Sequence, residues 1–162
     1  MKLTRRKTLL ALAAGALSVR GKSPFNSLSI AQAAPEFSNS LKIPELFEGI
    51  PSGNTRQFQL TLQQGSSVFL PDTVTPTLGI NGDFLGPTLH FRKGEQVEMR
   101  VQNQIGEAST LHWHGFHVPA NQDGGPFQPI ENGGTWTPNF TVLQNAGTYW
   151  YHSHIMDTAG EQ

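Results

Sequence analysis

The 162-residue sequence contains no cysteine, few charged residues and no long hydrophobic run. Without cysteine, the chain by itself cannot form a disulfide framework, a thiolate nucleophile, an iron–sulfur cluster or a thiolate-ligated zinc or copper centre. Only 14% of its residues are charged, against about 25% in an average soluble domain. The apolar run at residues 9–17 is far shorter than the roughly 20 residues that a membrane-spanning helix needs. We therefore expect no disulfide scaffold and no membrane span.

The net charge of −1 averages over two unlike regions. Residues 1–33 carry six basic and no acidic side chains, which leaves five basic and twelve acidic side chains, a net charge of −7, for residues 34–162. An acidic body is a poor partner for nucleic acid or for an anionic membrane surface. We therefore expect no nucleic-acid partner, and the basic N-terminal region needs an explanation of its own.

The first 33 residues have the organisation of an export signal. A basic segment precedes the apolar run at residues 9–17, and Ala31-Gln32-Ala33 matches the A-x-A cleavage pattern. The adjacent Arg5 and Arg6 resemble the pair that twin-arginine export receptors recognise. We predict a twin-arginine signal peptide over residues 1–33 and a periplasmic or secreted location in a bacterium. The alternative is a short amphipathic or anchoring helix.

The rest of the chain has the pattern of short β-strands joined by tight turns. It is rich in turn residues, with 17 Gly and 11 Pro in the whole sequence, and no segment after residue 40 keeps a helical period over three turns. Alternating or short apolar segments occur at 57–62, 68–70, 88–92, 96–102, 110–114, 140–142 and 148–155. Strands at this spacing are typical of a β-sandwich or barrel. We expect an extended lead-in over residues 34–54 and one β-domain over residues 55–162.

Four of the six histidines form two His-x-His pairs, His112 with His114 and His152 with His154. Residues i and i+2 of a strand point to the same face, so each pair presents two imidazoles side by side. Two such strands placed opposite each other can bring four imidazoles together. Imidazole binds copper, zinc, iron and nickel, and copper is bound most tightly among the divalent ions. One pair alone favours a structural or exposed role, whereas two pairs on predicted strands favour a metal site.

The same alternation assigns the aromatic residues beside these pairs to faces. Trp113 falls on the face opposite His112 and His114, where it can pack in the core. Trp150 falls on the same face as His152, and Tyr151 lies opposite. We interpret the aromatic residues of these segments as packing residues and predict no further role for them.

Longer motifs surround the histidine pairs. They are Leu-His-Trp-His-Gly at 111–115, Val-Pro-Ala at 118–120, Asp-Gly-Gly-Pro at 123–126 and Tyr-Trp-Tyr-His-Ser-His at 149–154. In this order and spacing, they resemble the N-terminal cupredoxin domain of multicopper oxidases, and the bacterial laccase-like and cuprous oxidase-like branches fit best. The resemblance implies an all-β fold, a Greek-key sandwich of the cupredoxin (plastocyanin-like) type.

The resemblance also implies a role for each paired histidine. His112 would bind the type 2 copper of a trinuclear cluster, His114 and His152 would share one type 3 copper, and His154 would bind the other. Asp123 matches a family carboxylate that helps to move protons during oxygen reduction; its alternative role is that of an ordinary turn residue. In the family, one-electron oxidation of a phenol, an aromatic amine or a metal ion is coupled to reduction of dioxygen to water.

By the same resemblance, this chain supplies four of the eight cluster histidines and no type 1 copper site. The other ligands, including the type 1 cysteine, belong to a C-terminal cupredoxin domain that is missing here. The family continues after His154 with a Gly-rich turn and another strand, so we expect the domain to lack its last strand and the chain alone to be inactive. Two alternatives remain: a non-catalytic copper-binding or buffering module, and a copper-free structural protein such as the cupredoxin-like proteins of bacterial cell division.

Overall fold

The computed structural model describes residues 40–162, so the predicted signal peptide lies outside the described residues. Within residues 40–162, the chain forms ten strands and one short 3₁₀ helix, η1 (Ala120–Gln122). The strands are β1 (Leu46–Phe47), β2 (Ile50–Ser52), β3 (Thr55–Leu70), β4 (Thr73–Ile80), β5 (Thr88–Leu89), β6 (Gln96–Gln104), β7 (His112–His114), β8 (Thr135–Trp136), β9 (Asn139–Thr141) and β10 (Trp150–His152).

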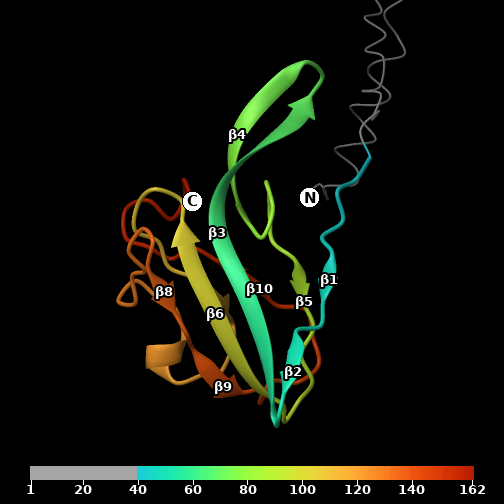
Figure 1. Cartoon of the computed structure of the whole chain (residues 1–162), viewed down its shortest axis with the longest axis vertical. Coiled ribbons are helices and arrows are strands. Elements are labelled where there is room, and N and C mark those ends of the chain that lie inside the picture. The colour runs from blue at the N-terminus through green and yellow to red at the C-terminus, as the bar shows by residue number, and fades with distance from the viewer. Residues whose placement is uncertain (1–39) are drawn as a thin grey trace, which may run out of the picture. The chain divides into compact units, whose positions relative to one another are not determined.

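The larger layer is a six-stranded sheet built around β3 and β6. These two strands run parallel, in register from Thr55 opposite Gln96 to Gln63 opposite Gln104. The strands β2 and β4 pair with β3, while β8 and β9 pair with β6. Beyond Gln63, the strand β3 continues only as a hairpin with β4, and this hairpin extends past the end of β6 (Figure 1).

Period-two alternation explains why β3 and β6 form the core of the domain. Phe58 and Leu60 of β3 and Val97, Met99 and Val101 of β6 are at most 1% exposed. The polar residues between them point to the other face of the sheet. Burying each such side chain stabilises the fold by about 1.5–3 kcal/mol. Both strands therefore turn their apolar face toward the core.

The smaller layer consists of two ribbons that pack against the same core. The strands β1 and β5 pair in parallel, and β7 and β10 pair antiparallel. Trp113 of β7 belongs to the buried hydrophobic cluster formed with β3 and β6, and the partly buried Phe47 of β1, Leu89 of β5 and Tyr151 of β10 pack against it. The chain is therefore a β-sandwich, and β1 and β2 lie within the segment expected to be an extended lead-in.

The sequence predicted the apolar run Val68-Phe69-Leu70 as a separate short strand, but the structure differs. This run is the distal end of β3, and its side chains are 50%, 41% and 66% exposed. This part of β3 pairs only with β4, beyond the end of β6, so the second layer does not cover it. An apolar run in the sequence therefore marks a projecting hairpin here.

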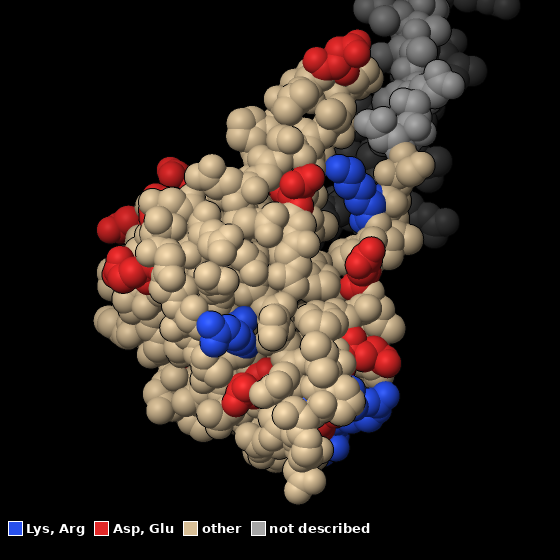
Figure 2. Space-filling model, viewed as in Figure 1, with Lys and Arg blue, Asp and Glu red and all other residues tan. Residues whose placement is uncertain are grey.

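The described part of the molecule contains no helix that is long and apolar enough to cross a membrane. Figure 2 shows one face, on which acidic side chains are scattered and the basic side chains form small, separate groups.

Candidate metal centre

The strands β7 and β10 bring the two histidine motifs together. In their antiparallel register, His112 lies opposite His152, Trp113 opposite Tyr151, and His114 opposite Trp150. Trp113 is 3% exposed and its ring centroid lies 6.1 Å from that of Tyr151, so this central pair points into the core. Alternation then places the histidines on the outer face of the ribbon. Trp113 and Trp150 thus fall on the faces that the sequence predicted.

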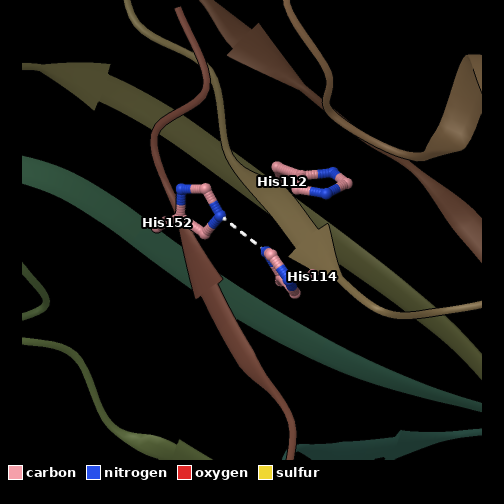
Figure 3. Close-up of side chains that lie close together, drawn as sticks. All are labelled: His112, His114 and His152. Carbon is pink, nitrogen blue, oxygen red and sulfur yellow. Dashed lines mark hydrogen bonds between the residues drawn. The ribbon is translucent and has the colours of Figure 1, made fainter. Parts of the chain in front are cut away.

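Three imidazoles converge on one small volume. The ligand nitrogens of His112, His114 and His152 lie within 4.8 Å of one another. In Figure 3, the rings of His114 and His152 point toward each other, and the ring of His112 lies beside them. Nδ1 of His114 lies 3.2 Å from Nε2 of His152. His154 is not part of this trio, but its ring centroid lies 5.2 Å from that of His112. The four paired histidines are therefore neighbours, and three of them form the tightest group.

Backbone carbonyls orient two of these rings. Nδ1 of His112 lies 2.9 Å from the carbonyl oxygen of Asp123, and Nδ1 of His152 lies 2.6 Å from that of Ser153. A carbonyl oxygen can only accept a hydrogen bond, so in both rings Nδ1 carries the proton. Nε2 then keeps its lone pair, the state in which a neutral imidazole binds a metal ion.

The loop that carries Asp123 is held against β7 by its backbone. The carbonyl oxygen of Asp123 accepts a hydrogen bond from the backbone N–H of Trp113 at 3.3 Å, and the indole N–H of Trp113 donates to the carbonyl oxygen of Gln122 at 3.0 Å. The carboxylate of Asp123 lies 3.4 Å from Nδ1 of His112 and is 33% exposed. Asp123 therefore contacts the same histidine through its backbone and its side chain.

The site favours the uncharged form of His152. Burial lowers the pKa of His152 below its ordinary value, and the neighbouring His112, His114 and His154 lower it further, against the opposing effect of the Ser153 carbonyl. A metal ion binds the neutral imidazole. The ring of His152 is therefore held in the neutral form that can offer a lone pair to a metal ion.

The donor set and its spacing fit a transition-metal ion. Imidazole nitrogens bind such ions at about 2.0–2.1 Å, so two of them on one tetrahedral ion lie about 3.3 Å apart. The 3.2 Å between Nδ1 of His114 and Nε2 of His152 matches this separation. An all-imidazole donor set suits copper, zinc, iron or nickel. The residues present can therefore hold a copper ion without a large rearrangement of β7 or β10.

The comparisons with known proteins decide the family. The family model described as multicopper oxidase matches residues 61–162. The chain belongs to the multicopper oxidase family. A multicopper oxidase of Staphylococcus haemolyticus is 38% identical over 125 residues, which are 76% of this chain and 28% of that protein. Copper resistance protein A of Escherichia coli is 41% identical over 101 residues, 60% of this chain and 16% of that protein.

Solved multicopper oxidase structures share the fold. The laccase from Pediococcus acidilactici superimposes with a TM-score of 0.74 at 34% identity, covering 80% of this chain and 28% of that one. A bacterial laccase-like multicopper oxidase from Ochrobactrum sp. superimposes with a TM-score of 0.70 at 35% identity, covering 76% of this chain and 27% of that one. The predicted all-β, cupredoxin-type fold is confirmed.

A further relative belongs to a different functional class. The cell division protein FtsP of Escherichia coli is 31% identical over 162 residues, which cover all of this chain and 32% of that protein. This chain spans at most about a third of the length of each of these curated relatives. The multicopper oxidase family is therefore shown for this domain, whereas the activity of a longer protein is a matter for the proposal below.

Sequence patterns missed two contacts at this candidate metal centre. One is the carbonyl of Asp123, whose hydrogen bond to His112 depends on how the loop folds back onto β7. The other is Trp150, whose indole lies 4.5 Å from the ring of His114 and 4.6 Å from that of His152, between centroids. The only sequence signal for this contact was alternation, which placed Trp150 on the same face as His152.

Proposed function

We propose that this chain is the copper-binding N-terminal domain of a periplasmic multicopper oxidase. In the full-length protein, it supplies half the histidines of a trinuclear copper cluster, and a C-terminal cupredoxin domain supplies the rest together with the type 1 site. The observation that carries the proposal is the convergence of imidazoles from β7 and β10 in a chain of this family. When bound, copper ions supply the redox chemistry that couples one-electron oxidation of a small substrate to reduction of dioxygen.

The proposed ligand roles are those that the family resemblance implies, and the positions of the rings are compatible with them. His114 and His152 share one type 3 copper, which is supported by the 3.2 Å between their facing nitrogens. His112 binds the type 2 copper through Nε2, since its Nδ1 donates to the carbonyl of Asp123. His154, at the margin of the trio, binds the other type 3 copper.

Asp123 is the proposed proton carrier beside the cluster. Its carboxylate lies 3.4 Å from Nδ1 of His112 and is partly exposed, so it faces both the histidines and solvent. In this position it can relay protons between solvent water and the site. The family-wide substrates, a phenol, an aromatic amine or a metal ion, would react at the type 1 site of the C-terminal domain.

Copper titration of the 162-residue chain tests the proposal. We expect at least one Cu(II) per chain to bind at micromolar concentration, measured by calorimetry and by electron paramagnetic resonance. Replacing His112→Ala or His152→Ala removes a ligand from a shared site, so each change weakens binding by roughly tenfold or more. His117→Ala, an exposed histidine outside both pairs, is the matched control. Absence of copper binding by the folded chain would contradict the proposal.

The same titration separates the two alternatives. A structural role is favoured by the 31% identity to the cell division protein over the whole chain, and it predicts a folded chain that binds no copper. A copper-buffering module predicts binding without a catalytic partner. The reading frame downstream of Gln162 distinguishes buffering from oxidase function, since an oxidase requires a further domain with a His-Cys-His motif.

A missing last strand is also part of the proposal. A largely apolar groove lies between the two ribbons of the smaller layer, lined by Leu89 of β5, Tyr151 of β10 and Leu78 of β4. Among the strands of residues 40–162, β5 pairs only with β1, and β10 pairs only with β7. An extended apolar segment would fit between them, and the downstream reading frame is expected to encode it.

A further inference from the structure

Trp150 occupies an unusual position for a large aromatic side chain. It is 59% exposed, yet its ring centroid lies 4.5 Å from that of His114 and 4.6 Å from that of His152. It lies directly opposite His114 in the β7–β10 register and two residues before His152 on the same strand. Its indole therefore contacts both imidazoles that face each other across the ribbon.

The need for such a contact is greatest at His114. The Nδ1 atoms of His112 and His152 are each hydrogen bonded to a backbone carbonyl. In residues 40–162, the ring of His114 hydrogen bonds only to His152, and His114 is an exposed residue. Within the described part of the chain, no backbone group hydrogen bonds to the His114 ring, and the indole of Trp150 lies nearer to it than the rings of His152 and His112, at 4.5 Å against 5.4 and 5.8 Å between centroids.

We propose that Trp150 is a positioning residue for copper binding. By packing on both rings, the indole holds Nδ1 of His114 and Nε2 of His152 at the 3.2 Å spacing that suits one copper ion. It also covers one side of the exposed His114 ring. This inference rests on the proposed function, because it assigns a role to Trp150 at that copper site.

The contact is tested first without any metal. An aromatic ring displaces the proton resonances of groups lying on its face, so the imidazole protons of His114 and His152 should shift when Trp150→Leu removes the indole. The resonances of His90, which lies outside the ribbon, should stay in place. Unchanged His114 and His152 resonances in the folded variant would overturn the inference, whether or not the chain binds copper.

Copper binding then measures the positioning itself. Two aromatic contacts of this kind correspond to roughly tenfold in affinity, so Trp150→Leu should weaken Cu(II) binding by about that factor. It should also alter the copper signal in electron paramagnetic resonance, because His114 is no longer held in place. Trp150→Phe keeps a ring over both imidazoles and should retain wild-type affinity within about twofold.

Controls separate this inference from the proposed function. Trp136→Phe alters a tryptophan that stacks on Trp113 inside the sandwich, and it should leave the copper signal unchanged. If the wild-type chain binds no copper, the proposed function fails. If the wild-type chain binds copper and folded Trp150→Leu binds it with the same affinity and signal, the positioning role alone fails.

Discussion

Gly124 determines how closely the Asp123 loop approaches β7. Its φ is +69°, and a Cβ atom at this position would lie 1.8 Å from the carbonyl oxygen of Leu111. Only glycine combines that backbone conformation with that separation. The close approach lets the carbonyl of Asp123 bond to both His112 and the backbone of Trp113. A single residue without a side chain thus contributes to the orientation of a proposed ligand.

Gly124→Ala should therefore destabilise the domain and loosen His112. A strained left-handed residue and a clash with backbone together should cost about 2–4 kcal/mol of unfolding free energy, measured by urea denaturation. Gly133→Ala is the matched control, since Gly133 has a φ of +79° and open space around its Cβ position. Equal losses for the two variants would show that the contact with Leu111 is unimportant.

At the scale of elements, the turn before β6 is tied to the start of β3 by an ion pair. Arg56 of β3 donates from Nε to the carboxylate of Glu95, and the backbone N–H of Arg92 donates to the same carboxylate. Both side chains of the ion pair are less than 20% exposed. Burial acts to raise the pKa of Glu95, but these hydrogen bonds and the charges of Arg56 and Arg92 together lower it.

This ion pair predicts a stability loss in acid. Because the folded pKa of Glu95 is lowered, its contribution is complete above the ordinary value of 4.5 and is lost as pH falls through the folded pKa. Glu95→Gln should cost roughly 1–2 kcal/mol at pH 7, and the difference from wild type should shrink below about pH 4. Urea denaturation at several pH values measures it. Glu98→Gln is the control, since Glu98 accepts from the neutral amide of Gln57; a gap independent of pH would contradict the assignment.

At the scale of the whole molecule, charge separates the N-terminal region from the domain. All six basic side chains of residues 1–33 precede a body of net charge −7. The acidic body is the part that folds into the sandwich and carries the histidines. We therefore propose that the basic region directs export and that the acidic region binds copper.

Export through the twin-arginine route requires the arginine pair itself. Changing Arg5→Lys together with Arg6→Lys keeps the charge but removes the residues that the receptor recognises. We expect the precursor to accumulate in the cytoplasm, as followed by fractionation and by the size difference between precursor and mature chain. Arg20→Lys, outside the pair, should leave export intact. Normal export of the double variant would exclude this route.

The sequence by itself determined which face each residue of a regular strand occupies. Alternation identified the segments at 57–62 and 96–102 as strands and placed Trp113 opposite the histidines, because a period of two follows from backbone geometry alone. It also carried the family resemblance, through the order of the motifs around His112 and His152.

Only the tertiary structure decided which side chains touch. That β7 pairs with β10 in the register that sets His114 against Trp150 depends on packing between segments about 36 residues apart in the chain. The carbonyl of Asp123 bonds to His112 because the loop that carries it folds back onto β7. Val68 is exposed because β3 extends beyond the end of β6. Such contacts arise from three-dimensional packing, which one-dimensional periodicity does not encode.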